Sequence, residues 1–198
     1  MSKKKKKSYP ARIPRPVSGI RLQLHRSSGC RSWWAKKWFE AVEALGVAGR
    51  SARARNYAIS GQVTEVTLDS SSVTAKVVGG RREAYEVGIA FRPLPDDAKR
   101  AILGQLREEP MLIARLLNGE LPLEVETMFG KAGFPLFPGV KLGDRIYDVT
   151  THCSCPDWAN PCKHSLAVLM LLGEEAEFRP LILLELRGIR EAELYDKD

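Results

Sequence analysis

The sequence predicts an α+β fold: a small antiparallel β-sheet packed with helices, then a helical segment, then a β-hairpin–helix unit. Three observations support this prediction. Between residues 64 and 91 apolar and polar residues alternate, which is the period of half-buried strands. In residues 32–45 and 94–133 apolar residues recur every three or four positions, as in amphipathic helices. Near the C-terminal end, three cysteines and one histidine fall within twelve residues.

The length of 198 residues is enough for one domain or two small ones. Composition and periodicity divide the chain into four regions. We expect a basic, disordered tail at residues 1–19 and a helix with an antiparallel sheet at 20–93. A helical region at 94–145 and a hairpin–helix unit with C-terminal helices at 146–198 should follow.

The first helix is expected at Ser32–Leu45. Trp34 and Trp38 lie on one apolar stripe of this helix, Ser32 can cap its start, and Gly46 can end it. Tryptophans at this spacing either pack in a core or stack on nucleobases, and we expect the core.

The predicted sheet is built from short strands separated by turns. Alternation places strands at 64–68, 73–77 and 85–91, and we expect Asn56–Ser60 to be a further, first strand. Such a sheet needs a cover for its apolar face, and the tryptophan helix is the expected cover.

Three packing helices are expected between residues 94 and 133. Asp96 can cap the first, while Pro110 and Pro122 suit the first turns of the second and third. Their apolar stripes indicate core packing, and they carry no group of residues with an evident chemical role.

The charge of the chain is unevenly distributed. The net charge is +7, but residues 1–55 hold 15 Lys/Arg and 2 Asp/Glu, whereas residues 56–198 hold 16 and 22. A basic N-terminal quarter of this kind predicts a polyanionic partner, most commonly nucleic acid.

The basic residues have two interpretations. The run Lys3–Lys7 is either a solvated tail that aids solubility or an arm that contacts nucleic acid. Arg53 and Arg55, two apart, would share one face of a strand, with Arg50 just upstream. The candidate nucleic-acid-binding residues are Lys3, Lys4, Lys5, Lys6, Lys7, Arg12, Arg15, Arg21, Arg26, Arg50, Arg53 and Arg55.

The cysteine–histidine cluster predicts a metal site with the ligands Cys153, Cys155, Cys162 and His164. Three thiolates and one imidazole complete the tetrahedral shell of a structural zinc ion, one per chain, with no open position for a substrate. An iron–sulfur cluster, a redox Cys-x-Cys pair and unligated core cysteines are weaker alternatives. His152 adjoins the ligands, but strand alternation turns it away from Cys153.

Local signals suggest how the cluster is built. A strand at 146–151 should lead into Cys153, and Asn160 should cap a helix with Pro161 at its first position. The apolar residues after His164 predict that this helix is buried and ends at Gly173. A last helix should run from Pro180 to Gly188, and Cys30 is interpreted as a lone thiol outside the site.

The ligand motif reads Cys153-Ser-Cys-Pro-Asp-Trp-Ala-Asn-Pro-Cys-Lys-His164 and resembles the SWIM zinc finger. The stretch Leu-Arg-Gly at 186–188 is similar to prokaryotic SWIM proteins. The Trp34–Trp38 helix and residues 55–63 resemble those proteins more loosely. The resemblance implies a SWIM-type hairpin–helix finger. It also implies an adaptor role beside helicase-like ATPases of the Swi/Snf class.

Together these observations predict a non-enzymatic, zinc-binding adaptor that binds nucleic acid, with DNA favoured over RNA, and a helicase-like ATPase. No catalytic set or phosphate-binding loop is evident, so we expect no enzyme activity and no small-molecule substrate. One alternative is a protein-interaction module with Trp158 as its anchor, and another is an RNA- or ribosome-associated protein. Without a signal peptide or an apolar span, we expect a cytoplasmic location, which includes the nucleoid, and no membrane contact.

Overall fold

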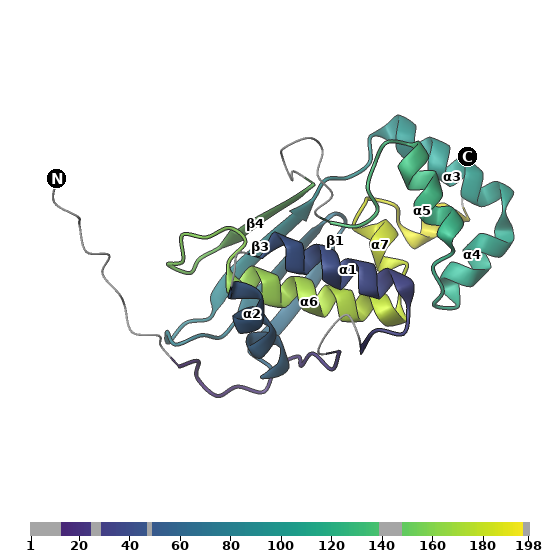
Figure 1. Ribbon diagram of the computed structural model, residues 1–198. Helices are drawn as coiled ribbons and strands as arrows, with labels where there is room; N and C mark the ends of the chain where they lie inside the picture. The colour runs from purple at the N-terminus through teal and green to yellow at the C-terminus, as the bar shows by residue number, and fades with distance from the viewer. Residues whose placement is uncertain (1–12, 25–28, 47–48, 139–147, 196–198) are drawn as a thin grey trace, which may run out of the picture.

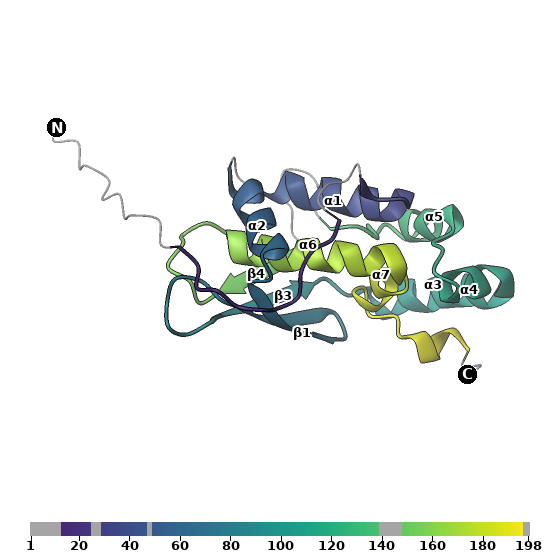
Figure 2. The same cartoon turned by 90° about the horizontal axis from the view of Figure 1, so that it is seen from below.

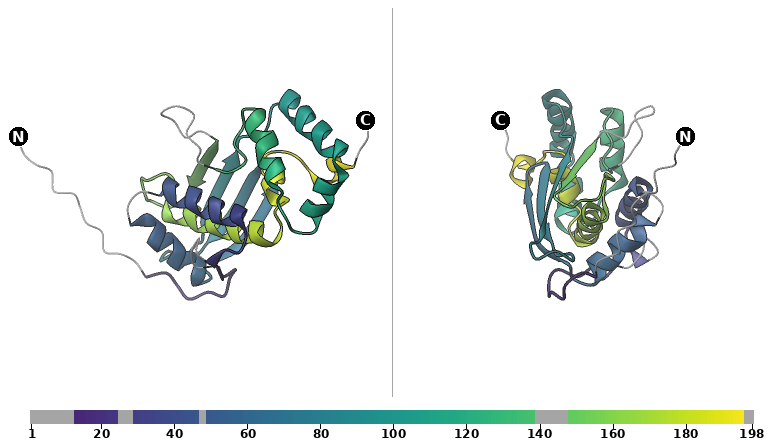
Figure 3. Two further views of the ribbon diagram at one scale, coloured as in Figure 1. Left: turned by 45° about the vertical axis from the view of Figure 1, so that its right-hand side comes forward. Right: turned by 90° about the vertical axis from the view of Figure 1, so that its left-hand side faces the viewer.

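The computed structural model describes residues 13–24, 29–46, 49–138 and 148–195, coloured along the chain in Figure 1. These residues form three layers. A four-stranded antiparallel sheet lies on one side, a long helix covers it, and two further helices pack on the outside of that helix (Figure 3). The predicted α+β class is confirmed.

The sheet has the strand order β1-β2-β3-β4. Its strands are β1 (Val63–Asp69), β2 (Ser72–Val77), β3 (Tyr85–Phe91) and β4 (Val149–Cys153), and every neighbouring pair is antiparallel. The three predicted strands from 64 to 91 are therefore confirmed. Side chains on β2 and β3 alternate between buried and exposed or half-buried, so one face of the sheet is apolar.

The long helix α6 (Lys163–Phe178) fills the centre of the molecule. Every residue from His164 to Gly173 is buried, because the helix has the sheet on one side and α1 (Trp33–Leu45) and α2 (Arg50–Ile59) on the other. The tryptophan helix α1 is as predicted, with Ser32 as its N-cap. It is not the principal cover of the sheet, however, because α6 occupies that place.

Gly173 was expected to end this helix, and that prediction is wrong. The helix continues to Phe178 past Gly173, which lies against the indole of Trp38. A Cβ atom at Gly173 would lie 2.4 Å from Cδ1 of Trp38. The glycine is therefore required by the close approach of α1 to α6 and does not mark a helix end.

The predicted strand at Asn56–Ser60 is also wrong, because most of this segment belongs to α2. Ala54 and Ala58, four residues apart, are both fully buried and bring α2 close to α6. Two small residues give a weak periodic signal in the sequence. The packing against α6 outweighs the weak strand propensity of this segment.

The remaining helices gather at the end of the molecule away from the start of α6 (Figure 2). The three predicted helices are α3 (Asp96–Glu108), α4 (Pro110–Leu117) and α5 (Leu123–Lys131). Near the C-terminus the chain forms the short α7 (Ile182–Glu185) and the 3₁₀ helix η2 (Glu191–Leu194). None of the helices in the part of the chain that the structure describes has the length and apolar character needed to cross a membrane.

The described part of the predicted tail is bound to the body of the fold. The backbone N–H of Arg15 donates to the carbonyl of Gly79, and that of Gly19 donates to Gly61. Ile20 then forms a β-bridge with Val63 at the edge of the sheet. Residues 13–19 are thus attached to the sheet region by backbone hydrogen bonds. Residues 1–12 lie outside the described residues.

Candidate metal centre

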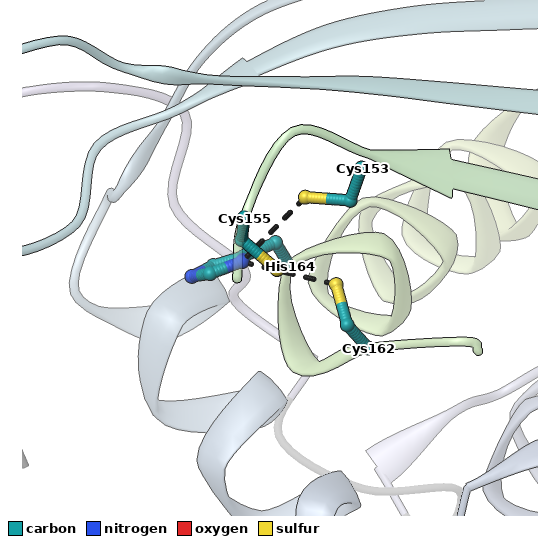
Figure 4. Close-up of side chains that lie close together, drawn as sticks. All are labelled: Cys153, Cys155, Cys162 and His164. Atoms are coloured by element: carbon teal, nitrogen blue, oxygen red, sulfur yellow. Dashed lines mark hydrogen bonds between the residues drawn. The ribbon is translucent and has the colours of Figure 1, made fainter. Parts of the chain in front are cut away.

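The four predicted ligands converge at the start of α6 (Figure 4). Cys153 is the last residue of β4, and Cys155 follows in the loop. Cys162 is the N-cap of α6, and His164 is the second residue of that helix. Their ligand atoms all lie within 4.8 Å of one another.

The distances suit zinc. The Nδ1 atom of His164 lies 3.7 Å from Sγ of Cys153 and 3.8 Å from Sγ of Cys162. A tetrahedron with ordinary Zn–S and Zn–N bonds has donor–donor edges of about 3.6–3.8 Å. The residues therefore form one Cys₃His site suited to a single structural zinc ion, and all four positions are filled by protein ligands.

The helix begins two residues later than the sequence predicted. Lys163 is its first residue, and Cys162 takes the N-cap position that was assigned to Asn160. The side-chain oxygen of Asn160 instead accepts a hydrogen bond from the hydroxyl of Thr151 on β4. This hydrogen bond holds the connecting loop against β4. Asn160 therefore stabilises the loop and does not cap the helix.

The thiols are electrostatically unequal. The pKa of Cys162 is lowered chiefly because its sulfur accepts a hydrogen bond from Cys153, with His164 acting in the same direction, and these effects outweigh burial. The pKa of the Cys153 thiol is correspondingly raised, first by donating that bond and then by burial. The N-terminal end of a helix also favours a thiolate, which is the metal-binding form.

Two aromatic rings orient His164. Its ring lies 4.9 Å from that of Tyr57 in an edge-on arrangement and 4.5 Å from the tilted ring of Tyr85, measured between centroids. Its buried Nε2 atom has no hydrogen-bond partner among the described residues. Aromatic packing therefore takes the place of the hydrogen-bonded partner that usually orients a ligating histidine. Neither tyrosine has a sequence signal that points to this role.

His152 and Cys30 stand apart from the site. His152 lies on β4 between two half-buried residues and is exposed, as alternation predicted. Cys30 belongs to the segment before α1, and burial followed by the charges of Glu177 and Glu174 raises the pKa of its thiol to about 11.

The structure separates the arginines of α2. Arg53 and Arg55 do not share a face as a strand would require, because they lie two apart on a helix. Arg55 pairs with Glu43 of α1, and Arg50 pairs with Asp157 at 3.4 Å. Arg53 is exposed and donates from Nε to the carbonyl of Gly49.

The structure describes only some of the remaining residues that were predicted to contact a partner. Arg15 and Arg21 are exposed, and Arg15 donates to the carbonyl of Arg82. Trp158 of the finger loop is 84% exposed, and the guanidinium of Arg50 lies 5.0 Å from the centroid of its ring. Lys3–Lys7, Arg12 and Arg26 lie outside the described residues.

Comparisons with known proteins agree with this geometry. Residues 140–173 match the model of the SWIM zinc finger family, so the chain contains a SWIM zinc finger. The chain is also homologous to the uncharacterized protein Rv2102 of Mycobacterium tuberculosis, with 35% identity over 180 residues. That match covers 90% of this chain and 63% of the relative, so the chain spans less than two thirds of the relative's length. No solved structure matches it.

Proposed function

We propose that this zinc-binding SWIM protein is a non-enzymatic adaptor. It binds nucleic acid, with DNA favoured over RNA, and a helicase-like ATPase of the Swi/Snf class. In this role the zinc ion stabilises the fold. Its four protein ligands leave no coordination position for a substrate. This function would place the protein in the cytoplasm, in association with the nucleoid.

The observation that carries the nucleic-acid half of the proposal is the segregation of charge. Residues 1–55 hold 15 Lys/Arg against 2 Asp/Glu, whereas the rest of the chain has more acidic than basic residues. Clustered lysines and arginines bind phosphates by releasing counterions, which gives affinity with little dependence on sequence. The ATPase half of the proposal rests on the SWIM finger alone.

A protein-docking module is the second candidate function, and the exposure of Trp158 favours it. An indole that is 84% exposed on a metal-stabilised loop can serve as the anchor of a protein interface. Co-purification with and without nuclease separates the two functions. A partner held by direct contact survives nuclease treatment, whereas a partner bridged by nucleic acid is lost.

A binding titration on protein of known zinc content tests the proposal. The full chain and a variant with Lys3–Lys7 replaced by glutamine would be titrated with fluorescent DNA and RNA of the same sequence at 50 and 200 mM salt. Binding that weakens steeply with salt, and less steeply in the variant, supports an adaptor whose N-terminal lysines contact phosphates. Preference for RNA would indicate an RNA-associated protein. Absence of binding to either would contradict the nucleic-acid function.

A further inference from the structure

We propose that the side of the protein around the metal site binds single-stranded nucleic acid, with Trp158 stacking on a base and nearby cations contacting phosphates. This inference rests on the proposed function and gives it a second location, separate from the N-terminal lysines. We call this surface the finger face. Its members are Arg50, Arg53, Tyr57, Arg81, Trp158 and Lys163.

The helix α2 supplies one edge of the finger face. Arg50, Arg53 and Tyr57 are spaced at i, i+3 and i+7 and therefore share one side of the helix. Arg50 reaches Trp158 in the finger loop, and Tyr57 packs on the ligand His164. This side of α2 thus follows the finger from its loop to the start of α6, with Arg53 between the two contacts.

One cation contacts each of the two aromatic rings that pack on His164. The ammonium group of Lys163 is 5.7 Å from the centroid of Tyr57, and the guanidinium of Arg81 is 5.9 Å from that of Tyr85. These distances are within the range of cation–π contacts, which keep the side chains in place without neutralising them. The positive charges are therefore held close to the finger.

Three cations of the finger face have no carboxylate partner among the described residues. Arg53, Arg81 and Lys163 pair with no carboxylate in residues 13–24, 29–46, 49–138 and 148–195, whereas Arg55 and Arg187 both do. A zinc ion with three thiolates carries a net charge of −1, which one of the three cations offsets. The remaining positive charge can be neutralised by the phosphates of a bound strand.

Trp158 selects a single strand as the partner. The guanidinium of Arg50, itself paired with Asp157, covers one face of the indole, and 84% exposure leaves the other face to solvent. Bases of a duplex are already stacked, whereas an unpaired base can stack on an exposed aromatic ring. The surrounding cations favour a nucleic acid over an apolar protein segment as the occupant of this face.

Four variants of the full chain, including the conservative Trp158→Phe, test this proposal with 20-nucleotide, dye-labelled DNA and RNA single strands. Trp158→Ala removes the stacking group, and Arg53→Ala/Lys163→Ala removes two phosphate contacts. Arg100→Ala/Lys131→Ala is the matched control, because it removes the same charge from exposed positions on α3 and α5 at the opposite end. Zinc content and melting temperature are measured for each variant, so that a folding defect is recognised.

We expect Trp158→Ala to weaken binding by about fivefold or more and Trp158→Phe to retain most of the affinity. The double finger-face variant should lower the slope of log affinity against log salt by about 1.4, since each phosphate contact contributes about 0.7 on single strands. The Arg100/Lys131 control should lower this slope by much less.

The outcomes are distinguishable from those of the proposed function. If the wild-type protein binds but the finger-face variants behave like the Arg100/Lys131 control, the finger face is not the binding surface and the adaptor function stands. If duplex DNA competes as well as single strands and Trp158→Ala changes nothing, the single-strand assignment is overturned. If the wild-type protein binds no nucleic acid, both proposals fail and Trp158 is left as a protein anchor.

Discussion

Arg187 and Asp148 form a buried ion pair that connects the C-terminal segment to the start of β4. Their side chains are 3% and 2% exposed, and Nη2 of Arg187 lies 2.8 Å from Oδ2 of Asp148. The same guanidinium donates to the carbonyls of Arg92, Leu136 and Phe137. One side chain thus joins the end of β3, the loop after α5 and the approach to the metal site.

Replacing Arg187 with methionine should destabilise the protein by about 3–5 kcal/mol, because it leaves the Asp148 carboxylate buried without its cation. Replacing both residues, with Asp148→Leu added, should recover part of this loss. Urea denaturation of the zinc-loaded proteins measures both effects. A loss below about 1 kcal/mol in the single variant would show that the pair is not important for stability.

Gly173→Ala should lower the free energy of unfolding by about 1–3 kcal/mol even though alanine favours helices, because the added methyl overlaps the indole of Trp38. The control is Gly104→Ala in α3, where an added Cβ meets nothing within 4 Å. That variant should gain up to about 1 kcal/mol. Thermal and urea unfolding of the two variants should therefore move in opposite directions.

The same glycine shows where sequence reasoning succeeds and where it fails. The strands from 64 to 91 and the helices from 96 to 131 are predictable, because their signals lie within the segments themselves. The place of Gly173 depends on Trp38, which lies far away in the sequence and reaches it only through tertiary packing. The strand prediction for residues 56–60 fails for the same reason, because the helical state of α2 depends on its packing against α6.

The candidate site divides in the same way. Its four ligands lie within twelve residues, so their spacing alone predicts the zinc site. Tyr57 and Tyr85 orient His164 from two other elements, and no local motif predicts these ring contacts. Arg53 and Arg55 were predicted to share a strand face because the sequence does not reveal that this segment is helical. It also does not reveal that Arg50 and Arg55 pair with carboxylates.

Cys162→Ser should release the zinc ion and disrupt the hairpin–helix unit, because a closed zinc site contributes directly to folding stability. Cys30→Ser is the control, since Cys30 is a cysteine outside the ligand set. Metal analysis should give one zinc per chain in the control and less in Cys162→Ser. Equal zinc content and equal melting temperature in the two variants would contradict the assigned ligand set.

Cys30 should react slowly with iodoacetamide at pH 8. Burial and two glutamates raise its pKa to about 11, so the reactive thiolate is scarce in the folded protein. We expect alkylation of folded, zinc-loaded protein at Cys30 to be at least about tenfold slower than in urea, as followed by peptide mass.

The raised pKa of Cys30 also predicts a pH dependence of stability. The unfolded chain ionises this thiol at lower pH than the folded chain, so Cys30 contributes a stability that is complete below about pH 8. This contribution should be lost as the pH rises toward about 11. Comparing urea denaturation of the wild type with Cys30→Ser isolates it, and identical pH profiles would contradict the shift.

The central position of α6 has a consequence for the order in which the protein is made. The sheet strands β1–β3 and the helix α1 lie in the first half of the chain, but residues 163–178, which cover their apolar surfaces, come near its end. During synthesis these surfaces emerge before the helix that buries them. The sheet therefore cannot bury its apolar face against α6 until the metal-binding segment has left the ribosome.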